Sequence, residues 1–133
     1  MTVRRPTKKV ELGAPRKYLG KAVEYLEVAE GAGSNHPSPA VGNAVHAGIL
    51  AADAISAHGL GEVWSGDHEG AVDHVKRTPV GKEAARHLHR LLSMKSRAQY
   101  DWVNPTPKQV EQALKAARRL VELAGQVLNP SDA

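Results

Sequence analysis

Apolar residues recur at helical spacing along most of the chain, beginning near Pro15. Leu19, Val23 and Leu26 repeat every three or four residues, which places them on one face of an α-helix. Proline is favoured in the first turn of a helix, so the pattern predicts a helix that starts at Pro15. Residues 31–39 are rich in Gly, Pro, Ser and Asn, which predicts a loop after this helix.

The second apolar segment, residues 39–57, consists mainly of alanine and glycine, with valines and isoleucines at helical spacing. Small residues at this density let neighbouring helices approach closely, so a tightly packed helix is predicted here. Gly59 and Gly61 follow it, and glycine is typical of a helix C-terminus. The next stretch, residues 62–66, is predicted to be a loop.

Three further helices are predicted in the second half of the chain. Asp67 is a suitable N-cap for a short helix over residues 68–77. Residues 82–102 carry leucines at helical spacing and predict a fourth helix. Thr106 and Pro107 have the residue types favoured at the N-cap and first position of a last helix.

These segments together predict an all-α fold, an up-and-down helical bundle of four to five helices. No segment shows sustained strict alternation, and no internal repeat is visible. We expect a flexible basic N-terminal arm over residues 1–14, a helical domain over residues 15–129 and a disordered tail over residues 130–133.

The composition excludes several classes of site. The chain of 133 residues has no Cys, which rules out disulfides, zinc–thiolate sites, iron–sulfur clusters and thiol nucleophiles and fits a cytoplasmic protein. No apolar run approaches the roughly 20 residues that a membrane span needs, so no membrane association is predicted. Neither a GxxxxGK[ST] phosphate loop nor a GxSxG nucleophile elbow is present, and no cofactor is predicted.

The net charge of +4 belongs to the first nine residues, which hold four basic residues and no acidic one. The remaining chain has 14 basic and 14 acidic residues, but they are unevenly distributed. Lys82, Arg86, Arg90 and Arg97 fall on one row of the predicted fourth helix, with Lys95 beside it. Such a row can contact phosphates, or it can be a solvated helix face paired with acids of neighbouring helices.

A second polar pattern lies on the predicted second helix. Asn43, His46 and Asp53 share one face of that helix. This polar stripe can line a functional site or a subunit interface, and Asp67, His68 and Tyr100 are further candidates for the same site or interface. It can equally be the side of the helix that faces water.

The sequence DHEGAVDH at residues 67–74 has the composition of a metal or acid–base cluster but not its spacing. An HExxH motif would need a second histidine at the position of Val72. His68 and His74 are six residues apart, on different faces of a helix. No metal site is therefore predicted, and Asp67 is interpreted as a helix cap.

Three stretches of the chain resemble a known superfamily. SMKSRAQYDWV (93–103), followed by a proline-containing break and an amphipathic helix, resembles the end of a HEPN domain. AVGNAVHAGILAADAISAHGLG (40–61) and GDHEGAVDHV (66–75) resemble an actinobacterial subgroup of that superfamily. The resemblance covers roughly residues 15–128.

The resemblance implies a four-to-five-helix bundle that often forms homodimers. Many HEPN proteins are metal-independent endoribonucleases of toxin–antitoxin, phage-defence or CRISPR-linked systems, with the motif Arg, four to six residues, His. Arg97 matches the arginine, but Trp102, Val103 and Asn104 stand where the histidine should be. Tyr100 lies too early to match the tyrosine that follows the histidine in other members. The ribonuclease centre implied by the resemblance is therefore incomplete.

Three functions remain open from the sequence. The first is a non-catalytic, dimeric module that binds RNA or a protein partner, such as an antitoxin or a nucleotidyltransferase, with phosphate contacts from Arg86, Arg90, Lys95 and Arg97. The second is a divergent endoribonuclease toxin that combines Arg97 with a histidine from elsewhere, His46 first. The third is a scaffold or regulator whose polar stripe lines a dimer interface or small-molecule pocket.

Overall fold

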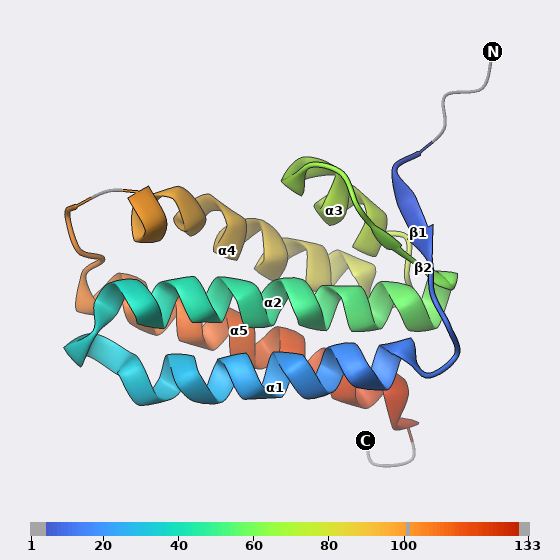
Figure 1. Cartoon of the computed structure of the whole chain (residues 1–133), viewed down its shortest axis with the longest axis horizontal. Helices are drawn as coiled ribbons and strands as arrows, with labels where there is room; N and C mark the ends of the chain where they lie inside the picture. The colour runs from blue at the N-terminus through green and yellow to red at the C-terminus, as the bar shows by residue number, and fades with distance from the viewer. Residues whose placement is uncertain (1–4, 101, 131–133) are drawn as a thin grey trace.

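The computed structural model describes residues 5–100 and 102–130, and for residues 96–100 it describes the backbone alone. This part of the chain is a helical bundle, as predicted (Figure 1). Its helices are α1 (Ala14–Ala32), a 3₁₀ turn (Gly33–Asn35), α2 (Pro37–Leu60), α3 (His68–Val75), α4 (Gly81–Tyr100) and α5 (Pro107–Leu128). Two short strands, β1 (Thr7–Lys9) and β2 (Glu62–Trp64), accompany them.

The four long helices run up and down along the longest axis of the molecule (Figure 1). α2 packs against α1, α4 and α5, and α5 also packs against α1 and α4. The short helix α3 lies against α4 beside the C-terminal half of α2 (Figure 1). On α2, His46 is exposed and Asn43 and Asp53 are half-buried.

The alanines and glycines of α2 form the middle of the core. Ala44, Ala47 and Ala51 are completely buried, and so are Leu91 of α4 and Leu120 of α5, which belong to the same core. A Cβ atom on Gly48 would clash with Leu91 Cδ1 and would lie 3.3 Å from Leu120 Cδ1. The missing side chain therefore allows α4 and α5 to approach α2 closely.

The predicted starts of α3 and α5 agree with the structure. Thr106 accepts a hydrogen bond from the Gln109 amide, and the Gln109 side chain accepts one from the Thr106 amide, which completes a capping box. Asp67 caps α3 by accepting from the Gly70 amide at 2.9 Å. The loop predicted at 31–39 is shorter than expected, because α2 already begins at Pro37. The helix is closed by Gly61, where φ is 70°.

The flexible arm predicted over residues 1–14 is wrong for residues Thr7–Lys9, which form β1. The loop predicted at 62–66 is wrong in the same way, because Glu62–Trp64 form β2. The two strands pair antiparallel, with Thr7 opposite Trp64. The Ser65 amide also donates to the Pro6 carbonyl at 2.7 Å. Strands of three residues are too short to show a period of two in the sequence.

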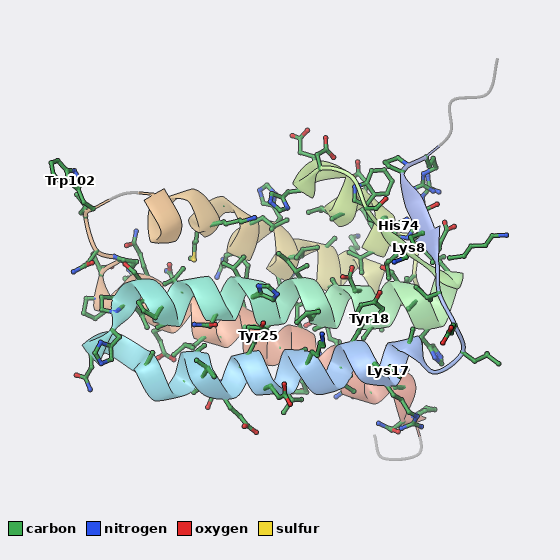
Figure 2. All side chains as sticks on the ribbon, viewed as in Figure 1. Lys8, Lys17, Tyr18, Tyr25, His74 and Trp102 are labelled. Atoms are coloured by element: carbon green, nitrogen blue, oxygen red, sulfur yellow. The ribbon has the colours of Figure 1, made fainter. Side chains whose placement is uncertain are left out.

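A buried histidine fixes this small sheet to α3 (Figure 2). His74 Nε2 lies 3.2 Å from the Glu62 carbonyl oxygen, and its Nδ1 lies 3.3 Å from Arg5 Nη2. A carbonyl only accepts and a guanidinium only donates, so Nε2 carries the proton and Nδ1 accepts. The Arg5 guanidinium also lies over the Trp64 ring, 5.4 Å from its centroid. Arg5 therefore serves to dock the N-terminal segment.

Among the described residues, one helix, α2, is long enough and apolar enough to cross a membrane. Of its most apolar stretch, 67% is buried inside the bundle. Its apolar residues face α1, α4 and α5, which is the environment of a core helix. In the sequence this helix is not an unbroken apolar run, because His46 and Asp53 interrupt it.

Because α2 closely contacts α4 and α5, substitutions at two glycines of α2 are expected to have opposite effects on the free energy of unfolding. Gly48→Val is expected to lower the free energy of unfolding by about 1–3 kcal/mol, since the new side chain meets Leu91 and Leu120. Gly42→Ala is the control: no neighbouring atom lies within 4 Å of its Cβ, and alanine favours helix by about 0.5–1 kcal/mol. Chemical denaturation measures both, and a Gly48→Val variant as stable as wild type would contradict the close packing.

Candidate functional site

Three members of the predicted cationic row lie on the solvent side of α4, and two of them, Arg86 and Arg90, are predicted phosphate-binding residues. Lys82, Arg86 and Arg90 are all exposed, and we call them the basic face of α4. Among the residues that the structure describes, none of the three forms an ion pair with an acid. The interpretation of this row as a set of surface salt bridges therefore finds no support in the described residues.

The acidic residue next to this row is neutralised from α5. Glu83 accepts hydrogen bonds from both Nε and Nη2 of Arg119, the second at 3.0 Å. His87 Nε2 lies 3.3 Å from Glu83 Oε2. The hydrogen bond from Arg119 lowers the pKa of Glu83 to about 2, against the opposing effect of burial. Glu83 is thus held toward α5 instead of pairing with Lys82 or Arg86.

Lys95 does not belong to the basic face. It follows Leu88 by seven residues, two helical turns, and so lies on the side of α4 that faces α3. Its Nζ lies 3.0 Å from His68 Nε2, and because an ammonium only donates, that nitrogen accepts. Arg97 and Tyr100 lie in the last turn of α4, and their side chains fall outside the described part of the molecule.

The three members of the polar stripe on α2 have different surroundings. Asn43 Nδ2 donates to the Pro39 carbonyl at 2.8 Å, a bond within the helix. His46 is exposed and stacks on Tyr25 of α1, with ring centroids 4.3 Å apart and an interplanar angle of 19° (Figure 2 labels Tyr25). Asp53 is half-buried. The structure therefore brings Asn43 and His46 into no common site with Asp53.

Asp53 lines a cleft of about 170 Å³ between α2, α4 and the segment that leads from β2 into α3. Asp67 and His68 also line this cleft, and Lys95 lies at its edge through its contact with His68. Four of the residues singled out from the sequence therefore meet here. The remaining walls are made mainly of apolar and small side chains: Ile49, Ala52, Ser56, Trp64, Ser65, Gly66, Ala71, Leu88 and Leu92.

The electrostatics of Asp53 distinguish it from the other acids. Burial raises the pKa of Asp53 to about 7, because a carboxylate loses its hydration in this cleft. No hydrogen bond or ion pair to Asp53 is present among the described residues, although Tyr18 of α1 is close: burial and then the charge of Asp53 raise the Tyr18 pKa. At neutral pH the carboxyl group of Asp53 can therefore hold or release a proton.

Sequence reasoning missed two residues that the structure makes prominent. Trp64 forms a wall of the cleft, and its Nε1 donates to the Asp67 carbonyl at 2.8 Å. Trp102 is 99% exposed in the α4–α5 loop. The scarcity of aromatic residues, 4% of the chain, could have drawn attention to both tryptophans.

Comparison of the chain with protein-family models, with curated proteins and with solved structures gives no match. The resemblance to HEPN domains therefore rests on the sequence stretches alone. Within the described residues, no three His, Asp or Glu side chains are grouped so that they could hold a metal ion.

The raised pKa of Asp53 predicts a pH-dependent gain in stability for Asp53→Asn. The folded state keeps this proton up to a pH of about 7, whereas an unfolded chain releases it near 3.8. The fold therefore loses stability progressively between these values, because only the unfolded chain releases the proton over this range. The amide that replaces it carries no charge, so the free energy of unfolding of the variant should exceed wild type by about 2–4 kcal/mol at pH 8 and by little at pH 4.

Urea denaturation between pH 4 and pH 8 measures this difference. Asp73→Asn removes an exposed acid from α3 and serves as the control, with an expected change of about 0.5 kcal/mol or less. A difference for Asp53→Asn that stays constant with pH would contradict the assignment.

Proposed function

We propose that the protein is a non-catalytic RNA-binding module that contacts the sugar–phosphate backbone of single-stranded RNA through the basic face of α4. The observation that carries this proposal is the exposure of Lys82, Arg86 and Arg90 without acidic partners among the described residues. A neutral domain that keeps three such cations on one helix face has a local positive potential, which attracts phosphates.

The geometry of the helix makes this face suited to a polyanion. Lys82, Arg86 and Arg90 follow at intervals of four residues, so each lies about 6 Å further along the axis. The row therefore extends for about 12 Å and offers three separate donors to consecutive charges of one chain. The Arg119–Glu83 pair supports the row by removing the nearest negative charge from it.

An exposed aromatic residue lies beyond the C-terminal end of this helix. Trp102 protrudes from the α4–α5 loop, away from the bundle (Figure 2), and the next residue, Val103, is 67% exposed. Exposed aromatic rings of this kind stack on unpaired bases, whereas the bases of a duplex are not available to them. The exposure of Trp102 therefore favours single-stranded RNA over duplex RNA as the ligand.

The positions of the histidines support binding without cleavage. A metal-independent ribonuclease needs a group that exchanges a proton with the ribose 2′-hydroxyl, and Arg97 cannot do so because its pKa is above about 12. His46 stacks on Tyr25, His68 accepts from Lys95, and His87 contacts Glu83. Each of these three rings has a contact within the bundle, whereas His89 of α4, the fourth candidate histidine, is exposed.

The same proposal includes a cytoplasmic location and self-association. Two apolar side chains of α1, Val23 and Val28, are exposed, the second by 56%, and they are candidates for contacts with a second copy or a protein partner. Light scattering of the purified protein, which gives its mass in solution, tests self-association directly.

The basic face predicts a specific change in the salt dependence of RNA binding. Arg86→Gln with Arg90→Gln should weaken binding to a single-stranded oligonucleotide and reduce the slope of log K against log salt by about 1.4, because two phosphate contacts are lost. Fluorescence anisotropy at several salt concentrations measures this slope. Gel electrophoresis of the same samples shows whether the RNA stays intact.

The matched control is Lys17→Gln with Lys21→Gln, which removes two exposed cations from α1 (Figure 2 labels Lys17). It should leave the slope unchanged. If the two double variants have equal effects, RNA binding depends on the total charge of the protein and not on the basic face of α4, which overturns the proposal. Cleavage of the RNA without metal, abolished by Arg97→Ala, would instead establish the ribonuclease function.

Stacking by Trp102 predicts an effect of a different kind. Trp102→Ala should weaken binding of single-stranded RNA about tenfold or more, since one stacked base contributes about 1–3 kcal/mol. The salt slope should not change, because no phosphate contact is lost. Trp102→Phe, which keeps an aromatic ring, should recover most of the affinity. If Trp102→Ala binds like wild type, bases do not stack there.

A further inference from the structure

We propose that the cleft between α2, α3 and α4 binds a small organic cation, an amine-type group on an apolar body, with the Asp53 carboxylate as its counter-ion. This site is separate from the basic face of α4. Leu88 and Leu92 of α4 line the cleft, whereas Arg86 and Arg90 are exposed to solvent. The inference therefore does not depend on RNA binding.

The shape of the cleft limits the size of its ligand. Its volume of about 170 Å³ is below the roughly 300–1,000 Å³ of sites for drug-sized molecules. Ile49, Leu88 and Leu92 supply apolar walls from two helices, and Trp64 closes the side toward β2. A short alkyl or single-ring body can bury its surface against these residues.

The charge of the cleft requires a cation rather than an anion or a neutral apolar ligand. Asp53 is half-buried and has no hydrogen-bond or ion-pair partner among the described residues, and a carboxylate that loses part of its hydration without gaining a partner is destabilised. Around it, Tyr18 of α1 and Asp67 before α3 add no positive charge. Lys95 of α4, the cation at the edge of the cleft, is bound to His68 at 3.0 Å. A ligand ammonium group would supply the missing partner.

The same residues do not suit an inorganic divalent ion. Calcium takes about six to eight oxygen ligands, and Asp67 uses its side chain to cap α3. Within the described residues, no group of three His, Asp or Glu could hold a metal. One carboxylate among apolar walls therefore points to a cation that brings its own apolar surface.

The experiment uses the whole protein and matched pairs of probes. Butylammonium and benzylammonium are titrated against the protein, and butanol and benzyl alcohol serve as neutral probes of similar shape. Chemical shifts of the Trp64 indole N–H and of the Ile49, Leu88 and Leu92 methyl groups report binding in the cleft. Saturable shifts with the ammonium probes alone are the expected result.

The pH dependence of the affinity shows whether Asp53 binds the ligand as a carboxylate or as a protonated acid. Asp53 must lose its proton to bind a cation, so affinity should rise about tenfold between pH 6 and pH 8 at constant ionic strength. Affinity that falls over this range would mean that a protonated Asp53 donates to the ligand, which overturns the proposal. An absence of saturable shifts with both ammonium probes also overturns it.

Two isosteric variants complete the test. Asp53→Asn should reduce the affinity for the ammonium probes at pH 8 at least tenfold, and its cooperative unfolding confirms that the fold is kept. Asp73→Asn, which removes an exposed carboxylate of α3, should bind like wild type. Equal binding of ammonium and alcohol probes, or undiminished binding by Asp53→Asn, would show that Asp53 is not the counter-ion.

Discussion

The close approach of α4 and α5 to α2 is the constraint on which the rest of the structure depends. Ala44, Ala47 and Ala51 present a nearly flat surface, and Leu91 and Leu120 fill the space against it. The chain has no Phe, so no single large ring fills the centre. The larger side chains of α2, Val41, Val45 and Ile55, are buried in the same core, and the cleft with Asp53 lies at its edge.

The local parts of this fold could be predicted from the sequence. A helix cap such as Asp67 or Thr106 acts on amides two or three residues away, so its residue type and position carry the information. The helical class follows from the apolar period for the same reason. The boundaries of α2 were less accurate, because Pro37 and Gly61, which delimit it, lie among other turn-forming residues.

The parts that depend on distant residues could not be predicted. β1 and β2 are separated by more than fifty residues, and their contact with His74 and Arg5 has no sequence period. The candidate cleft is similar, because Asp53 and His68 meet only when α3 folds onto α4. Helical spacing correctly places Arg86 and Arg90 on the outer side of α4. It does not place Lys95 with them, because Lys95 lies two helical turns after Leu88 and therefore on the side of the cleft.

The distribution of the tryptophans decides what an optical measurement on this protein can see. The chain has two, and neither is in the core: Trp102 is exposed to water, and Trp64 lies between the N-terminal segment, β2 and α3. Intrinsic tryptophan emission therefore reports on the surroundings of Trp64, beside α2, α3 and α4, and not directly on the packing between α1 and α5. In the absence of RNA and of a cleft ligand, release of Trp64 from beneath Arg5 changes the emission, so detachment of the small sheet would look like global unfolding unless circular dichroism is recorded beside it.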